Sequence, residues 1–218
     1  MTKQLFLAAA MLSFSTPAFA QISEIRLGAN FHDIDWSGAG NDSSKERSSA
    51  INGEIMFEEP ELLKWALSPQ PYLGGALNFG GETSFGGGGL LWRQTIGENF
   101  YFDFSFGLVV HDGTLEATPS SLVQSVIDDA DIENSFTDEQ RAQFLSELED
   151  FRFRQDNGID FGNRLLFREQ ISIGYRWSEN WSAHLFVEHL SHGNILAGAR
   201  PNEGLDTLGM RASYHFSL

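Results

Sequence analysis

The sequence of 218 residues contains no cysteine, so neither a disulfide framework nor a thiolate metal site can form. Basic residues are scarce, because 14 lysines and arginines stand against 30 acidic residues and the formal net charge is −16. Nucleic-acid binding depends on neutralising phosphates with lysine and arginine, so nucleic acid is not the expected partner. Beyond the N-terminal region the chain also lacks the roughly 20 consecutive apolar residues that a membrane-spanning helix needs.

The first 20 residues have the pattern of a secretory signal peptide. Lys3 precedes an apolar run that ends in the small-residue pattern Ala18-Phe19-Ala20. We therefore expect residues 1–20 to be removed on export and residues 21–218 to form a single domain. An exported chain of this kind can enter a membrane only through strands.

Apolar and polar residues alternate through much of the remaining chain. Between residues 99 and 110, four phenylalanines and a leucine share one face of a strand, while polar or small residues occupy the other. The expected strands cover residues 25–32, 50–57, 72–79, 87–95, 99–110, 169–177, 181–191 and 208–218. Several approach the 9 to 11 residues that a tilted membrane-spanning strand requires.

An even number of strands can close without exposed edges, so we predict an all-β, eight-stranded antiparallel transmembrane β-barrel. Its apolar face would contact lipid, and its polar face would line the interior of a multi-pass protein in the outer membrane. The alternative is a soluble sandwich or a lipocalin-like barrel, in which the apolar face would point inward.

Residues 112–157 form an acidic insertion that is too long for an ordinary strand connection. Thr137 and Gln140 have the spacing of a capping box, which predicts a helix starting there. The insertion is either a solvated amphipathic flap or a segment that docks a partner or bridges cations. The glycines near residues 80–89 lack the lysine of a phosphate-binding loop and fit a barrel strand with small side chains better.

Polar residues interrupt the outward face of the strand at 181–191. His189 and Ser191 have the parity of Val187, so they are expected to point outward, whereas His184 and Glu188 are expected to point inward. Near the membrane interface an outward polar group costs only about 0 to 1 kcal/mol. The pair is therefore either the edge of the apolar band or a reactive site that faces lipid.

The segment His189-Leu190-Ser191 is followed by Pro201-Asn202-Glu203-Gly204-Leu205-Asp206. Together with GLVVHDG at 107–113 and GNRLLFREQISIGYRW at 162–177, these segments resemble the lipid A 3-O-deacylase (PagL-like) family of outer-membrane barrels. The resemblance covers most of residues 21–218 apart from the acidic insertion. The chain departs from the family at His192, where asparagine is usual, and in a longer connection to the acidic residue.

The resemblance implies a serine esterase that removes an ester-linked acyl chain, at the 3-O position, from lipid A of lipopolysaccharide in the outer leaflet. Ser191 would be the nucleophile and His189 the base. Asp206 has the outward parity of the final strand and is the preferred orienting acid, whereas Glu203 lies in a turn and is the alternative.

Three residues that follow the serine are candidates for stabilising the oxyanion, through the backbone N–H groups of His192 and Gly193 or the side chain of Asn194. The mechanism needs no metal and no cofactor. The rival functions are a noncatalytic structural or adhesive barrel and an outer-membrane phospholipase, and the oligomeric state stays open.

Three cations near the expected outer loops are candidates for holding the lipid A phosphates, since the rest of the exterior is acidic. These cations are Lys45, Arg47 and Arg200.

Overall fold

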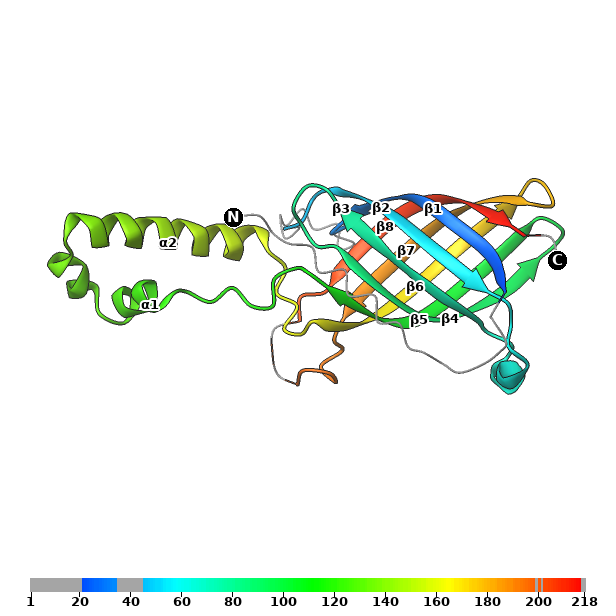
Figure 1. Ribbon diagram of the computed structural model, residues 1–218, viewed down its shortest axis with the longest axis horizontal. Helices are drawn as coiled ribbons and strands as arrows, with labels where there is room; N and C mark the ends of the chain where they lie inside the picture. Colours follow the sequence, from blue (N-terminus) through cyan, green and yellow to red (C-terminus); the bar gives the residue numbers. More distant parts are fainter. Residues whose placement is uncertain (1–20, 35–44, 199, 201, 217–218) are drawn as a thin grey trace.

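Eight antiparallel strands pair in chain order, and the last strand closes on the first to make a barrel (Figure 1). The computed structural model describes residues 21–34, 45–198, 200 and 202–216. The expected signal peptide lies outside these residues. The strands are β1 (Ile22–His32), β2 (Ser49–Phe57), β3 (Gln70–Asn78), β4 (Phe85–Ile96), β5 (Phe100–His111), β6 (Leu165–Arg176), β7 (Trp181–Ser191) and β8 (Leu205–His215). Each of the eight expected strands is confirmed by one of these, and residues 217–218 of the last expected strand lie outside the described residues.

The barrel is apolar outside and polar inside, as β5 shows. Phe102 on its outer face is 39% exposed, whereas Tyr101 and Asp103 on its inner face are 3% and 1% exposed. The alternative of a soluble barrel with its apolar face inward is therefore wrong. Among the described residues, no helix is both long and apolar enough to cross a bilayer.

Buried ion pairs fill the middle of the barrel. Arg26 lies 2.8 Å from Glu24 and 2.8 Å from Asp103, measured between guanidinium nitrogens and carboxylate oxygens. Arg168 pairs with Glu54 at 2.6 Å. Each of these charges has lost its water, so its partner is needed to compensate it. The inward-facing charges of the sequence thus support one another across several strands.

Glycines make room for large rings inside the barrel. A Cβ atom at Gly209 would lie only 2.3 Å from Cζ of Phe186, and one at Gly174 would lie 2.3 Å from Cζ of Tyr101. Any side chain at these two positions would displace the ring on the neighbouring strand. The glycine run 86–89 lies within β4, so these glycines form part of a barrel strand.

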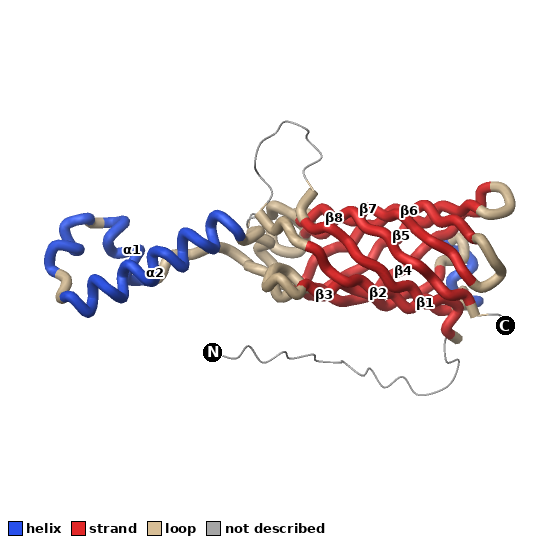
Figure 2. The backbone as a smooth tube through the Cα atoms, turned by 90° about the horizontal axis from the view of Figure 1, so that it is seen from above, coloured by secondary structure: helices blue, strands red, loops and turns tan. Residues whose placement is uncertain are grey.

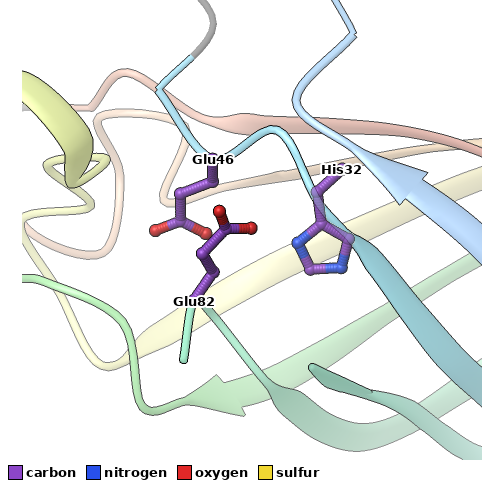
Figure 3. Close-up of side chains that lie close together, drawn as sticks. All are labelled: His32, Glu46 and Glu82. Atoms are coloured by element: carbon purple, nitrogen blue, oxygen red, sulfur yellow. The ribbon is translucent and has the colours of Figure 1, made fainter. Parts of the chain in front are cut away.

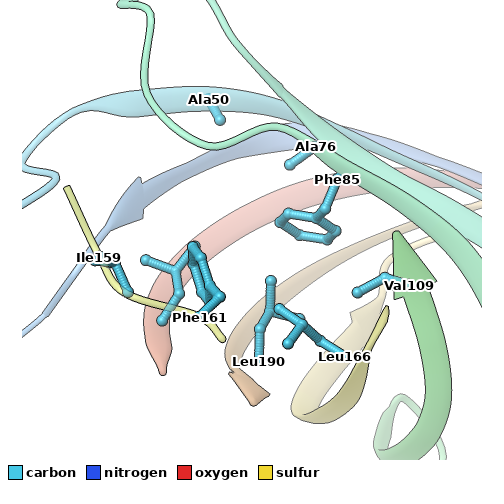
Figure 4. Packing of buried hydrophobic residues seen from close by; sticks show 9 residues of the cluster. Ala50, Ala76, Phe85, Val109, Ile159, Phe161, Leu166 and Leu190 are labelled. Carbon is cyan, nitrogen blue, oxygen red and sulfur yellow. The ribbon is translucent and has the colours of Figure 1, made fainter. Parts of the chain in front are cut away.

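An apolar plug closes the end of the barrel that carries the long connections, which we call the long-loop end (Figure 4). Ile159 and Phe161 come from the segment that precedes β6 and are 2% and 0% exposed. They pack against inward-facing residues of the strands. The complete cluster comprises Ala50, Ala76, Phe85, Val109, Ile159, Phe161, Leu166, Leu190 and Leu205. The alternating pattern predicts a polar interior, and this cluster departs from it, as does a smaller buried group formed by Met56, Tyr72 and Leu91.

A helical extension between β5 and β6 projects away from the barrel at the long-loop end (Figure 2). It contains α1 (Ser121–Asp128), the 3-10 helix η2 (Ala130–Ser135) and α2 (Asp138–Asn157). The capping box is confirmed, because the Gln140 N–H donates to Thr137 Oγ1 and the Thr137 N–H donates to Gln140 Oε1. At the opposite end of the barrel, the short 3-10 helix η1 (Glu61–Ala66) connects β2 to β3.

Candidate active site

Strands β7 and β8 place a histidine and an aspartate side by side on the outer surface of the barrel. His189 pairs with Asp206 in the register of the two strands. Neighbouring inward residues are buried, among them Glu188 at 4% and Leu205 at 0% exposure. Side chains directly opposite on antiparallel strands are within reach of one another, so the register itself forms the contact.

The imidazole of His189 is hydrogen-bonded to the carboxylate of Asp206, with 2.7 Å between Nδ1 and Oδ1. A carboxylate can only accept, so Nδ1 carries the proton and donates it. In the neutral ring Nε2 then presents a lone pair, which is the form that a general base requires. Both side chains are partly exposed, at 44% and 36%, so this pair is accessible from outside the barrel.

Gly204 lies close to the imidazole ring of His189. Its φ is +75°, a left-handed conformation that glycine adopts without strain. A Cβ atom at this position would lie 3.0 Å from Cε1 and 3.6 Å from Nε2 of His189. The turn before β8 therefore needs glycine both for its backbone conformation and for the space that the imidazole occupies.

Ser191 lies two residues after His189 at the end of β7, with the same outward parity. Their Cα atoms are about 6.6 Å apart in an extended strand, so a hydroxyl and an imidazole can meet by side-chain rotation. Within the described residues, Ser191 and His189 make no hydrogen bond to each other. Catalytic hydrogen bonds often tighten only when substrate binds.

The loop after Ser191 is held by its own hydrogen bonds. The His192 N–H donates to Oδ1 of Asn202 at 3.0 Å, and the Asn194 N–H donates to Nδ1 of His192 at 3.1 Å. Gly193 and Asn194 have φ angles of +59° and +57°. Of the backbone N–H groups at 192–194, that of Gly193 makes no hydrogen bond within the described part of the chain.

Asn202 also takes part in the site, a role that its sequence pattern does not indicate. It lies in the PNEGLD segment two residues before Gly204, and its carboxamide joins that segment to the loop after Ser191. An asparagine between proline and glycine predicts a turn, and a turn pattern gives no indication of a contact ten residues earlier.

Glu203, the alternative acid, points elsewhere. Its carboxylate is 2.8 Å from Nζ of Lys45 and accepts the Asp160 N–H at 2.9 Å. It therefore ties together three connections at the long-loop end. The same ion pair compensates the charge of Lys45, one of the three cations predicted to hold lipid A phosphates.

The other two expected phosphate ligands also lie at the long-loop end. Arg200 Nη1 donates to the backbone oxygen of Gly162 at 3.3 Å, and Arg47 is exposed just before β2. Lys45 and Arg200 contact different segments of this end, Glu203 and Gly162 respectively.

A groove of about 400 Å³ runs along the outer surface beside the histidine. Its apolar walls are Phe104, Ile171 and Val187, from β5, β6 and β7. His189 and Asp206 also line it, and Glu169 faces His189 from β6. Because the groove opens on the apolar exterior, a hydrocarbon chain can enter it directly from the bilayer.

A closed eight-stranded barrel with an apolar exterior and a charged interior is a transmembrane β-barrel. On its outer surface this one carries a hydrogen-bonded His–Asp pair, with a serine two residues from the histidine. The sequence model of the family described as lipid A 3-O-deacylase (PagL) matches residues 144–215, which include β6, β7 and β8. The resemblance found in the sequence is confirmed over these residues.

Similar folds occur among solved structures. The outer membrane enzyme PagL is 10% identical over 89% of this chain and 100% of its own, with a TM-score of 0.47. Neisserial surface protein A is 7% identical over 88% and 96%, with a TM-score of 0.47. The N-terminal barrel domain of Pseudomonas aeruginosa OprF is 9% identical over 89% and 98%, with a TM-score of 0.43. No curated protein matches the chain.

Proposed function

We propose that the protein is an outer-membrane serine esterase that hydrolyses an ester-linked acyl chain of lipid A. The observation that carries this proposal is the 2.7 Å hydrogen bond between His189 and Asp206 on the lipid-facing surface, two residues from Ser191. These residues lie within the stretch that matches the lipid A 3-O-deacylase family. Because that family is described as acting at the 3-O position, we propose the same acyl position here.

In the proposed reaction, the Ser191 hydroxyl attacks the ester carbonyl while Nε2 of His189 takes its proton. The tetrahedral intermediate then collapses to an acyl-serine as its C–O bond to the sugar breaks, and the imidazolium gives its proton to the departing sugar oxygen, which becomes a hydroxyl. Water, activated by the same histidine, releases the fatty acid from the serine. Asp206 holds the ring in the required tautomer and stabilises its positive charge.

The oxyanion is stabilised by donors in the loop after Ser191. The Gly193 N–H is the backbone candidate, because the N–H groups of His192 and Asn194 already donate to Asn202 and His192. The carboxamide groups of Asn194 and Asn202 are the side-chain candidates. Each such donor typically contributes about 3 to 4 kcal/mol to transition-state stabilisation.

Substrate reaches the site by lateral movement within the membrane. One acyl chain would lie in the groove formed by Phe104, Ile171 and Val187, which places its ester near His189. Arg200 and Arg47, at the long-loop end, would hold the phosphates of lipid A. Lys45 contributes less, since Glu203 already compensates its charge.

The experiment that tests this function compares lipid A from cells that lack the protein, contain it, or contain Ser191→Ala. Mass spectrometry should show the loss of one acyl chain with the unchanged protein and with the Ser172→Ala control, and no loss with Ser191→Ala or without the protein. Ser172→Ala is a matched control, because this buried serine faces the interior and its Oγ has no partner among the described residues.

Phospholipids from the same cells separate the rival functions. Lysophospholipid in place of altered lipid A would identify a phospholipase instead. Unchanged lipids of both kinds would favour a noncatalytic barrel whose helical extension is the active part.

A further inference from the structure

Three potential metal ligands meet inside the barrel at the long-loop end (Figure 3). His32 is the last residue of β1, Glu46 lies just before β2, and Glu82 lies in the connection from β3 to β4. One ligand atom from each residue lies within 4.8 Å of the other two. Segments far apart in the sequence therefore bring an imidazole and two carboxylates together.

His32 has no partner of its own in this pocket. Its side chain belongs to a residue that is only 3% exposed, and neither ring nitrogen makes a hydrogen bond within the described residues. Figure 3 shows one ring nitrogen on the side of Glu82. Buried polar groups are almost always hydrogen-bonded or bound to an ion, so a ring left in this way indicates a ligand.

The two carboxylates are oriented by neighbouring residues. Glu46 accepts hydrogen bonds from the N–H of Thr83 at 3.0 Å and from its hydroxyl at 2.8 Å. Glu82 accepts from Nδ2 of Asn78 at 3.4 Å. Hydrogen bonds of this kind fix the orientation of metal ligands and leave their remaining lone pairs available.

An entry path leads to the carboxylates from outside the barrel. Glu46 and Glu82 line a groove of about 580 Å³ between the connections of the long-loop end. Asp112 and Glu116 also line this groove, together with Lys45, Arg154 and Arg164, so apart from the two proposed ligands its acidic and basic groups roughly balance.

We propose that His32, Glu46 and Glu82 bind a divalent transition-metal ion, for which Zn²⁺ is the best fit. An imidazole favours Zn²⁺ over Mg²⁺ and Ca²⁺, and Zn²⁺ also accepts carboxylate oxygens. Ligands around tetrahedral Zn²⁺ are about 3.4 Å apart, so side-chain movements of about 1 Å would complete the site. The groove supplies water as the fourth ligand.

A bound ion would connect the end of β1 to the segments before β2 and before β4. The residue next to Glu46 is Lys45, whose partner Glu203 lies in the turn that leads to Asp206. The ion would therefore hold the segments of the long-loop end together. This role does not depend on the proposed esterase activity.

The test is isothermal titration of ZnCl₂ into the folded barrel in detergent, with CaCl₂ and MgCl₂ titrated in parallel. We expect stoichiometric Zn²⁺ binding and much weaker binding of the other two ions. His32→Gln and Glu82→Gln should each weaken Zn²⁺ binding by more than the roughly 10- to 100-fold typical for loss of an outer-sphere partner. Heat-modifiable gel mobility confirms that each variant is folded.

Glu116→Gln is the matched control, because it removes one negative charge from the same groove without removing a ligand. It should leave Zn²⁺ affinity unchanged. Equal losses in all three variants would show diffuse attraction to an acidic surface and overturn the proposal. Absence of Zn²⁺ binding to the unchanged protein would overturn it as well.

Discussion

His189 owes its orientation to a residue on another strand. The carboxylate that holds its ring is 17 positions away and comes into contact because β7 and β8 pair in one register. A shift of one residue would turn Asp206 into the barrel and leave His189 outside it. At the scale of single residues, the site therefore depends on strand register and on the side chains that touch the ring.

Asp206→Asn should lower the rate of lipid A deacylation by about 10³- to 10⁴-fold, because the amide no longer enforces the required histidine tautomer. Glu203→Gln should change the rate little, since Glu203 contacts Lys45 and Asp160 instead of the histidine. Turnover of purified lipid A measures the rates, and gel mobility checks folding. The opposite order of the two variants would identify Glu203 as the orienting acid.

Gly204→Ala should reduce turnover by displacing the imidazole, because its new Cβ would lie 3.0 Å from Cε1 of His189. Gly198→Ala is the control. Gly198 has a similar φ of +63°, and a Cβ there meets nothing within 4 Å. Both variants should lose about 1 kcal/mol of stability from backbone strain, whereas only Gly204→Ala should lower kcat. Equal kcat values for the two variants would show that a Cβ atom at residue 204 does not displace the imidazole of His189.

At the scale of elements, the barrel and the helical extension are largely separate. The extension joins the barrel through a narrow base, where the Ala117 N–H donates to Asp160 at 2.9 Å and the Phe161 N–H donates to Thr114 O at 3.2 Å. The segment just after α2 returns into the barrel as the apolar plug. We therefore expect the helices to contribute little to the stability of the barrel and the plug to contribute much.

Replacing residues 121–157 by a short glycine–serine linker should leave barrel folding intact, because a shorter loop also closes at a lower entropic cost. Phe161→Ala should instead lower the free energy of unfolding by about 3 to 5 kcal/mol, the usual cost of removing a buried phenylalanine ring. Urea unfolding of the folded barrel in vesicles measures both. A large loss from the linker replacement would show that the helices support the barrel.

The positions of the strands, and the side of the sheet to which each residue points, could be predicted from the sequence. Side chains alternate with a period of two along a strand, and this alternation is visible in the sequence around Phe102 and His189. The same parity predicted the His189–Asp206 contact. The plug at Phe161, the Asn202 contact with the His192 N–H and the facing of Glu169 toward His189 could not be predicted. The first two depend on the path of a loop back to the barrel, and the third depends on which residues pair across neighbouring strands. Neither can be read from the residues of a single segment.

At the scale of the whole molecule, the interior charges act as one network. Glu54 is the point at which it converges, because Arg26, Arg168 and Arg211 all lie within 3.4 Å of its carboxylate. Removing one partner from such a buried group leaves the others uncompensated. The stability of the barrel therefore depends on residues that lie far from its outer surface.

Glu54→Gln should lower the free energy of unfolding by about 3 to 5 kcal/mol, because three buried guanidinium groups would lose their shared carboxylate. Glu61→Gln removes a carboxylate from an exposed i,i+3 pair with Lys64 and should cost at most about 0.5 kcal/mol. Urea unfolding midpoints in vesicles compare the two. Similar losses for both variants would show that the interior network is not coupled.

The filled interior also determines how the protein affects the permeability of its membrane. Eight strands enclose a lumen only wide enough for side chains, and here ion pairs occupy its middle while Ile159 and Phe161 seal the long-loop end. Solutes therefore have no continuous aqueous route through it. Planar bilayers that contain the protein should therefore show the conductance of bare lipid, and a large stepwise conductance would show that the interior is open to ions.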